Sequence, residues 1–570
     1  MLIVRRLGGS SRRRVVSRVG CGIVVLLASL TSVVLRRSVP IPYGLSALDD
    51  VLFLRSAGSI ANGDWLGPYD SLTLSKGPAY PVFIALMHDL GWELKVGEQL
   101  TYLLAAAVLA LAVWFTTGRL ATSTAAYVIV ALDPVSFDSQ SAELIRDNWQ
   151  GSLGLLFVAA VFLALQLALT RRRWWAWAGA AVLAGVSGGV YWLCREEGAA
   201  ILPGIAVIVV GTPLLWARAE GHRVRLRTMA RYGCALALVG GTFAAPLLVV
   251  RALNAEHYGV AITVETAEGS YPAAYADWTR VGGGSTTHYV PLTTAQRLAV
   301  YRVSPAAREI ESFLERPANP AFAPKVLSGA QTVWAIRDAA AHAGKFSSAA
   351  EAQDFFARLD AEINAGCDSG VLACAPRLPA SLQSLQRAPL GTVTRVAATM
   401  TSSVLTGKGL LDQGTTRGAS RQVTRAGVAA LVAGVPADEA AASSQQAQFR
   451  ATTWRLDVLG AVYGPLLVVL AVIAVVAGLR GWWRLRWPRS PLLVLGLALA
   501  VGLAVRTVLL AVITAADYNA SIARYQLAGR FLFVGAVVVG CAAAVEMIAD
   551  RRRQEPPDPV RASRSSSGSS

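Results

Sequence analysis

Long apolar segments divide this chain, and most of them are close to the length that a helix needs to cross a bilayer. That length is about 20 predominantly apolar residues. The segments are 19–35, 97–117, 120–134, 151–170, 174–194, 199–217, 232–253, 456–479, 490–513 and 527–547. Because 54% of the 570 residues are hydrophobic and only 16% are charged, an ordinary soluble domain is excluded. We predict an all-α polytopic membrane protein with about ten transmembrane helices.

The shorter apolar stretch 79–91 is interpreted differently. It contains Pro81, His88 and Asp89, and we expect a helix that lies in the membrane interface rather than a crossing. Counting it as a crossing would move the arginine run 171–173 to the outer side, against the usual excess of basic residues in cytoplasmic connections. The first outer loop is therefore predicted to carry interfacial helices.

Basic residues favour one orientation of the predicted helices. The net charge is +17, and many arginines lie in the connections 171–173, 218–231 and 480–489. With the N-terminus inside, these connections are cytoplasmic, and Arg36 and Arg37 are the main exception. No nucleic-acid-binding motif accompanies the charge, and the preference for arginine over lysine suggests a bacterial source. We expect a multi-pass protein of the bacterial plasma membrane with both termini in the cytoplasm and no nucleic-acid partner.

The apolar segments also divide the chain into parts. These are a basic cytoplasmic N-terminus (1–18), a transmembrane module (19–253) that contains the first outer loop (36–96), an exoplasmic domain (254–455), C-terminal transmembrane helices (456–547) and a disordered cytoplasmic tail (548–570). The exoplasmic domain is expected to be mainly helical, since 295–316, 328–343 and 348–366 show helical periodicity. Its Cys367 and Cys374 can pair only in an oxidising compartment, so their pairing stays open.

Two adjacent carboxylates, Asp49 and Asp50, begin the polar part of the first outer loop. Carboxylates are costly near lipid and are often functional there. The alternative is a cap on a helix over 50–62, because Asp favours helix starts. Lys76 follows in the same loop, and its alternative role is a snorkelling anchor at the membrane surface.

The predicted topology brings further charged residues to the same outer face. They are Glu143, Arg146 and Asp147 in the second outer loop, Arg195 in the third, and Arg524 and Arg530 in or just after the last. For the second-loop residues the alternative is a salt-bridged loop without a catalytic role, because exposed ion pairs are common and weak. For Arg195 the alternative is an ordinary outer boundary of two spans. Arg524 and Arg530 lie on the outer side against the charge bias, which favours a functional role for them.

The order of these motifs resembles the GT-C class of integral membrane glycosyltransferases, in particular the dolichyl-phosphate-mannose protein mannosyltransferases and their aminoarabinose-transferring relatives. Such enzymes carry an acidic pair, a Gly-Asp-Trp-like element and a Lys-Pro-Pro-like motif in a long first outer loop. Here these read Asp49-Asp50, Gly63-Asp64-Trp65 and Lys76-Gly77-Pro78. The likeness covers about residues 20–255. It departs from the family's pattern in its Asp-Asp pair, where the family has Asp-Glu, and in Gly77, which replaces the first proline.

The resemblance implies a sugar donor linked to a polyprenyl phosphate, and a glycan, lipid or protein acceptor in the cell envelope. A carboxylate can take the proton of the acceptor hydroxyl, so Asp49 and Asp50 form the expected general-base site, with Asp49 favoured by the family's pattern. Cationic side chains would stabilise the leaving phosphate. The expected substrate-binding residues are Lys76, Glu143, Arg146, Asp147, Arg195, Arg524 and Arg530.

Other functions and a metal requirement stay open at this stage. Mg²⁺ or Mn²⁺ is compatible with carboxylates and a phosphate, although no sequence signature requires a divalent cation. A transporter or lipid flippase would need polar residues in mid-span, and only Arg506 lies well inside a predicted span. A non-catalytic envelope scaffold is a third class. The expected function is an inverting glycosyltransferase that depends on a polyprenyl-phosphate sugar.

Overall fold

The computed structural model describes ten stretches of the chain. They are residues 9–43, 48–137, 144–170, 173–219, 226–322, 329–378, 380–407, 424–483, 490–517 and 523–554. These residues form helices joined by loops, and within them the pairing of Val281 with Cys374 is an isolated bridge outside any strand. The predicted all-α class is confirmed.

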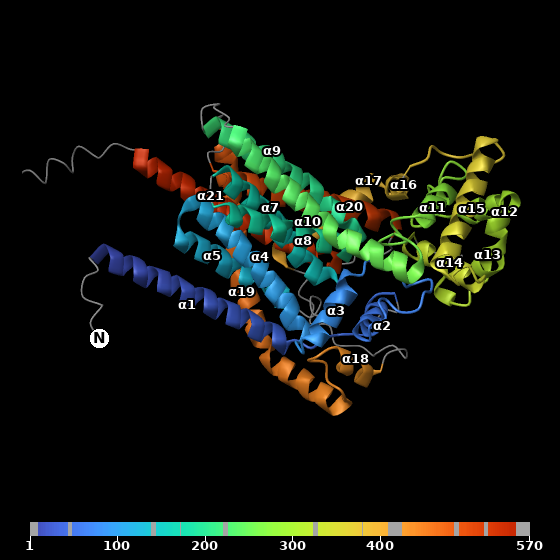
Figure 1. Ribbon diagram of the computed structural model, residues 1–570, viewed down its shortest axis with the longest axis horizontal. Helices are drawn as coiled ribbons and strands as arrows, with labels where there is room; N and C mark the ends of the chain where they lie inside the picture. Colours follow the sequence, from blue (N-terminus) through green and yellow to red (C-terminus); the bar gives the residue numbers. More distant parts are fainter. Residues whose placement is uncertain are drawn as a thin grey trace, which may run out of the picture.

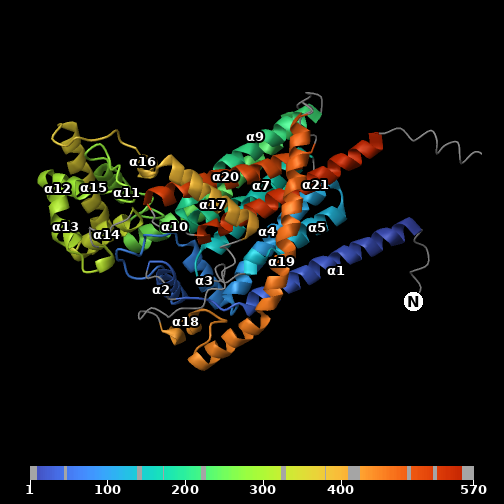
Figure 2. The ribbon, with the colours of Figure 1, turned by 180° about the vertical axis from the view of Figure 1, so that it is seen from behind.

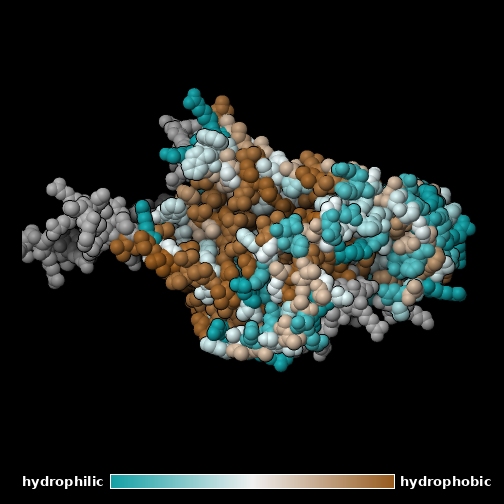
Figure 3. All heavy atoms as spheres, turned by 60° about the horizontal axis from the view of Figure 1, so that its bottom comes forward, coloured by the Kyte–Doolittle hydropathy of each residue, from teal (hydrophilic) through white to brown (hydrophobic). Residues whose placement is uncertain are grey.

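Nine helices of the described stretches are long and apolar enough to cross a membrane. They are α1 (Gly9–Ser38), α4 (Leu94–Thr117), α7 (Asp147–Leu169), α8 (Trp174–Cys194), α9 (Leu202–Ala219), α10 (Leu226–Tyr258), α19 (Glu439–Trp483), α20 (Leu492–Asp517) and α21 (Leu527–Gln554). Each contains or overlaps one of the predicted spans. The surface agrees with these spans. Apolar side chains form a broad band over the helical bundle, and the end of the molecule at the right of the view is hydrophilic (Figure 3).

The tenth predicted span, 120–134, is shorter than expected. It forms α5 (Leu120–Ala131), whose 12 residues rise only about 18 Å, well short of a bilayer core. Pro134 explains the early end, because the residue before a proline avoids helical geometry. The chain continues as the short helix η1 (Pro134–Phe137). The bundle therefore has nine long helices and one short apolar helix among the described residues.

The helix α7 forms the centre of the bundle. Of its apolar window, 94% is buried, and it packs against α4, α8, α10 and α21. The helices α1, α10 and α19 have only 11% of theirs buried, so their apolar faces are available to lipid. In both ribbon views, α1 begins and α21 ends at one end of the bundle (Figures 1 and 2). The connections that carry the polar motifs lie at the opposite end, called the loop end below.

The first loop (39–93) contains two short helices at the loop end. They are α2 (Asp50–Ala61) and α3 (Ala79–Asp89), which pack against each other. The stretch 79–91, predicted to be a helix that does not cross, forms α3 with 11 residues and a rise of about 16 Å. Its length agrees with the prediction, and its apolar side chains Tyr80, Phe83 and Ile84 are buried against neighbouring helices.

An inserted domain of five helices extends from the loop end (Figure 1). They are α11 (Ser270–Thr279), α12 (Thr294–Val303), α13 (Pro305–Glu315), α14 (Gly329–His342) and α15 (Ala349–Asp368), with η3 (Pro320–Phe322) between α13 and α14. The periodic stretches 328–343 and 348–366 form α14 and α15, whereas 295–316 forms two helices. Ser304 caps the second of these by accepting a hydrogen bond from Ala307, and Pro305 is its first residue. Proline suits that position because its missing N–H is not needed there.

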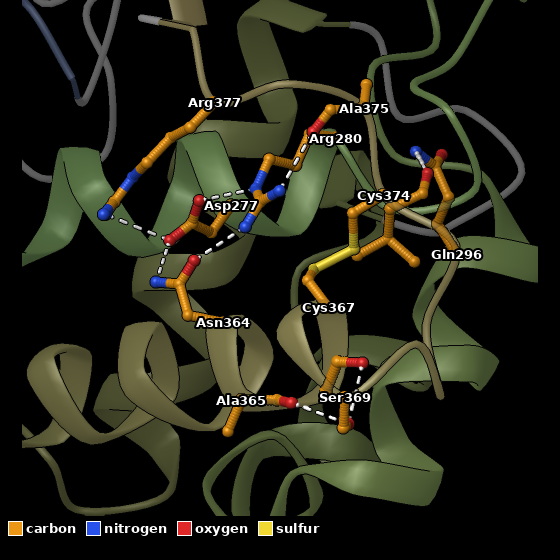
Figure 4. Close-up of a disulfide and its surroundings, with 12 residues drawn as sticks. Asp277, Arg280, Gln296, Asn364, Ala365, Cys367, Ser369, Cys374, Ala375 and Arg377 are labelled. Atoms are coloured by element: carbon orange, nitrogen blue, oxygen red, sulfur yellow. Dashed lines mark hydrogen bonds and ion pairs between the residues drawn. A yellow bond between two sulfur atoms is a disulfide. The ribbon is translucent and has the colours of Figure 1, made fainter.

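A disulfide and an ion-pair cluster lie close together in the inserted domain (Figure 4). Cys367 and Cys374 are bonded, with their Cα atoms 5.6 Å apart, so the open question about their pairing is answered. Beside them, the buried Asp277 accepts a hydrogen bond from Arg280 at 2.8 Å and pairs with Arg377 at 3.0 Å. The cluster connects α11 to the segment that follows α15.

Three further helices follow the inserted domain. They are α16 (Ala380–Arg387), α17 (Leu390–Thr406) and α18 (Arg425–Leu431). The helices α16 and α17 pack against α20, and α18 packs near α2 and α3. The helix α19 then begins at Glu439, well before the predicted span 456–479, because an alanine-rich sequence extends its helical start. The tail from Glu555 lies outside the described residues.

Candidate active site

Asp49 and Lys76 form an ion pair at the start of α2. Asp49 holds the N-cap position of this helix, yet its side chain makes no capping hydrogen bond. The neighbouring Asp50 is buried, and its Oδ1 accepts a hydrogen bond from the backbone N–H of Val51 at 3.0 Å. The Asp49 carboxylate is thus directed at a cation rather than at the helix start, which disfavours the capping interpretation.

Aromatic rings surround the ammonium group of Lys76. Its Nζ lies 5.4 Å from the centre of the Phe53 ring and 5.5 Å from that of Trp334. Phe53 is on α2, whereas Trp334 comes from α14 of the inserted domain. At these distances the negative faces of the rings attract the cation. Neither ring was among the residues predicted for the site.

Gly77, the departure from the family's pattern, has a steric explanation. A Cβ atom built at this position would lie 1.9 Å from the carbonyl oxygen of Leu193, near the C-terminal end of α8. Any side chain, proline included, would clash with that backbone unless α8 moved. The glycine therefore allows the Lys76 motif to approach the end of α8 and the third loop that follows it.

The second and third loops meet the first loop at this point. Arg146 donates a hydrogen bond to the carbonyl of Cys194 at 2.8 Å, and its guanidinium lies 5.7 Å from the centre of the Phe53 ring. The next residue, Asp147, pairs with Arg195, and both side chains are buried. Phe53 therefore lies beside both Lys76 and Arg146, and three predicted loops converge on one place.

The last loop supplies an aromatic neighbour to this cluster. Arg195 lies 4.3 Å over the ring of Tyr525, which belongs to the short helix η4 (Ala523–Gln526). Arg506, the charge inside α20, donates a hydrogen bond to the carbonyl of Tyr525 at 2.9 Å. The adjacent Arg524 lies in η4, but its side chain is outside the described part of the chain, and Glu143 is outside it altogether. Only the position of Arg524, next to Tyr525, connects it with the site.

Arg530 was expected to face the donor phosphate, but the structure places it elsewhere. Its Nη2 pairs with Asp133 at 3.1 Å, and its Nη1 donates to the carbonyls of Val404 and Leu405 at 2.6 and 3.1 Å. Both charged side chains are buried between α21, α17 and the end of α5. The contacts of Arg530 are those of a packing element that ties α17 to the bundle.

Arg36 and Arg37, the exceptions to the charge rule, both have acidic partners. The buried Arg36 pairs with Glu98 at 2.7 Å, and Tyr80 donates to the other carboxylate oxygen of Glu98 at 2.8 Å. Arg37 pairs with Glu93 at 2.5 Å. Because these carboxylates neutralise them, the two arginines can end α1 at the loop end at a smaller electrostatic cost.

Two described carboxylates of the site each face a cationic side chain. Among the described residues, no group of three or more His, Cys, Asp or Glu side chains lies close enough together to hold a metal ion. Asp49 faces an ammonium group, and Asp147 faces a guanidinium. The cationic side chains that lie here are Lys76, Arg146 and Arg195.

Residues 75–247 match a sequence model of the family described as dolichyl-phosphate-mannose-protein mannosyltransferase. The match begins at Ser75 and Lys76 and runs through the second and third loops, and over this part of the chain it confirms the family resemblance. The Asp49-Asp50 pair and the Gly63-Asp64-Trp65 element lie before it. None of the curated proteins compared with the chain matches it. Motifs, helical architecture and family match together support a GT-C class membrane glycosyltransferase.

Two solved structures of ArnT from Cupriavidus metallidurans are similar to this chain. The apo structure is 15% identical, with 93% of this chain and 78% of that chain covered and a TM-score of 0.32. The structure bound to undecaprenyl phosphate is 16% identical, with 92% and 77% covered and a TM-score of 0.31.

Proposed function

We propose that this protein is an inverting glycosyltransferase that moves a sugar from a polyprenyl phosphate to a cell-envelope acceptor. The observation that carries the proposal is the meeting of the Asp49–Lys76 ion pair with Arg146, Arg195 and Tyr525 at the loop end of the bundle. A partly exposed carboxylate and several cations in one place suit the two charges of the reaction, a proton to be removed and a phosphate to be released.

The proposed step is a single displacement at the anomeric carbon. The acceptor hydroxyl attacks that carbon, its oxygen forms the new glycosidic bond, and the bond from carbon to the phosphate oxygen breaks with inversion. The hydroxyl proton passes to the carboxylate of Asp49. The electron pair of the broken bond leaves on polyprenyl phosphate, whose charge the side chains of Lys76, Arg146 and Arg195 would stabilise.

The ion pair itself suggests an order of events. In the structure Lys76 balances the charge of Asp49. The phosphodiester of an incoming donor carries one negative charge, as the carboxylate does, and competes for the ammonium group. As the sugar–phosphate bond breaks, the leaving phosphate gains a second charge, which strengthens its attraction for Lys76. When Lys76 turns to the phosphate, the ammonium group no longer pairs with Asp49, and the carboxylate can accept the proton of the acceptor. Donor binding would thus prepare the base.

The proposed orientation places this site on the outer face of the bacterial plasma membrane. The start of α1 and the end of α21 lie at the end of the bundle opposite the site (Figures 1 and 2). The arginine-rich connections favour a cytoplasmic location for that end. A disulfide in the inserted domain is in keeping with an oxidising compartment. A thiol-reactive label at a Ser369→Cys site, exposed beside that domain's α15, would be reached from outside intact cells.

A direct assay tests the reaction class. The purified chain in lipid nanodiscs is incubated with polyprenyl-phosphate-linked sugars and membrane extracts as the source of acceptor. Release of polyprenyl phosphate together with glycosylated product supports the proposal, and inversion follows from the configuration of the product. A transporter or flippase would move the lipid between leaflets and leave the sugar–phosphate bond intact, so movement without release would refute the proposal.

A further inference from the structure

The inserted domain contributes a side chain to the candidate active site. Trp334, on α14, holds its ring 5.5 Å from Lys76 Nζ, at nearly the same distance as Phe53 of the first loop. Lys76 and Trp334 are 258 positions apart in the sequence. In both ribbon views α14 lies on the side of the inserted domain that faces the bundle (Figures 1 and 2). The domain is therefore part of the wall of the site.

Buried polar contacts hold α14 against the first loop. Arg337, one helical turn after Trp334, donates hydrogen bonds from Nε and Nη2 to the carbonyl of Ser71 at 2.9 and 2.6 Å. It also pairs with Glu265 at 2.7 Å, and both side chains are 1% exposed. Because a buried guanidinium with these partners is costly to displace, the position of Trp334 relative to the loop is well defined.

The chain just before the inserted domain adds to this anchoring. Glu265 accepts a hydrogen bond from the hydroxyl of Tyr69 at 2.7 Å, and its backbone N–H donates to the carbonyl of Leu74 at 2.8 Å. Thr266 donates to the carbonyl of Ser75, directly before Lys76, at 2.8 Å. Burial and the Glu265 charge raise the pKa of Tyr69 well above its ordinary value, so its hydroxyl stays a donor. The loop that carries Lys76 is thus fixed on the inserted domain.

We infer that Trp334 is a positioning residue for Lys76, and that the inserted domain is needed for binding of the donor phosphate. This inference rests on the proposed function. The two ring faces attract the ammonium group and restrict the conformations of a flexible side chain. A lysine held in this way needs less ordering when the phosphate arrives, which strengthens binding. The domain would then act on the donor, in addition to any contact with the acceptor.

Binding of a simple probe tests the inference. The full-length protein in nanodiscs is titrated with unsubstituted polyprenyl phosphate, and the dissociation constant is measured by calorimetry. Trp334→Leu keeps an apolar side chain without a ring face, and Trp334→Phe keeps a ring. We expect the Leu variant to bind about fivefold to tenfold more weakly, from the usual strength of a partly exposed cation–π contact, and the Phe variant to stay within about twofold of wild type. Trp454→Ala, an exposed tryptophan on α19, is the matched control and should bind normally.

A double-variant cycle with Lys76→Met separates this inference from the proposed function. If Trp334 acts through Lys76, then adding Trp334→Leu to Lys76→Met should cause no further loss of affinity. If Trp334→Leu binds polyprenyl phosphate as wild type does while Lys76→Met binds it more weakly, the inference is overturned and the proposed function stands. If the Leu and Phe variants lose the same amount of affinity, Trp334 contributes only packing, and the inference is overturned as well. Unchanged binding in Lys76→Met overturns the inference and the phosphate role of Lys76 together.

Discussion

Two ion pairs of this chain bring a cation to a carboxylate in different surroundings. Arg530 and Asp133 are 2% and 0% exposed, and the guanidinium also binds two carbonyls of α17. Lys76 and Asp49 are 10% and 24% exposed, and the ammonium group lies between loop and domain beside aromatic rings. An enclosed pair with all its donors engaged holds helices together. A pair open to solvent can exchange its carboxylate for the phosphate of a ligand, so exposure separates a packing role from a chemical one.

The strongest test of this comparison removes the charge of Asp49. Asp49→Asn should lower sugar transfer by about 100- to 10,000-fold, the usual contribution of a general base. The thermal midpoint should hardly change, because the remaining Lys76 keeps access to water. Initial rates and thermal unfolding of the same preparation check both parts. Asp89→Asn, an exposed carboxylate in the same loop, is the control and should behave as wild type. Full activity of Asp49→Asn would exclude it as the base.

The opposite pattern is expected for the enclosed pair. Asp133→Asn leaves Arg530 buried without its counter-charge, which costs about 3–5 kcal/mol of stability. The thermal midpoint should fall strongly, whereas the rate per folded molecule should stay near wild type. The double variant Asp133→Asn with Arg530→Met removes both charges and should recover much of the loss. A stable Asp133→Asn protein with impaired transfer would reverse the roles assigned to the two pairs.

The Asp147–Arg195 pair lies between these extremes, because it is buried and also borders the site. Arg195→Lys keeps the charge but loses the planar guanidinium that lies over Tyr525. We expect a stability loss of about 1–2 kcal/mol, the upper range for a desolvated cation–π contact, together with weaker donor binding. Thermal unfolding and the KM for the donor measure the two effects. A loss of stability alone would assign this pair to packing, and a higher KM alone would assign it to donor binding.

The smallest effect is expected at a partly exposed carboxylate of the inserted domain. Burial and the neighbouring Asp277 raise the pKa of Asp360 to about 6, although Arg377 opposes the shift. In the unfolded chain its pKa is near 4. Between these values the folded chain binds more protons, so stability should fall as the pH rises from about 4 to about 6. Asp360→Asn should flatten the dependence of the thermal midpoint on pH in this window, and Asp354→Asn, exposed on the same helix, should not. An unchanged slope in Asp360→Asn would contradict the assignment.

The sequence predicted the membrane helices well because hydropathy is a local property. Two of the boundary errors have local causes that were visible, Pro134 after the end of α5 and Pro305 at the start of α13. The convergence of Asp49, Lys76, Arg146 and Arg195 also followed from topology, since alternate connections of a helical bundle lie at the same end. Their roles in catalysis stay predictions, to be decided by the variants above.

Other features depend on partners that no local pattern reveals. The position of Arg530 in the sequence predicted a phosphate ligand. In the structure its guanidinium pairs with a carboxylate 397 residues earlier in the chain. Arg36 contradicted the charge rule until Glu98 was placed beside it. Trp334 carried no signal at all, because a tryptophan in an amphipathic helix is ordinarily a packing residue.

The amino-acid sequence by itself determined the helical class, the number and position of most spans, and the loops that carry charged groups. Burial in lipid requires long apolar helices, and the apolar character of each residue can be taken directly from the sequence. Only the tertiary structure decided which cation meets which carboxylate and which ring lies over Lys76. Those contacts join residues far apart in sequence, and their strength depends on burial and distance, which arise only when the helices pack.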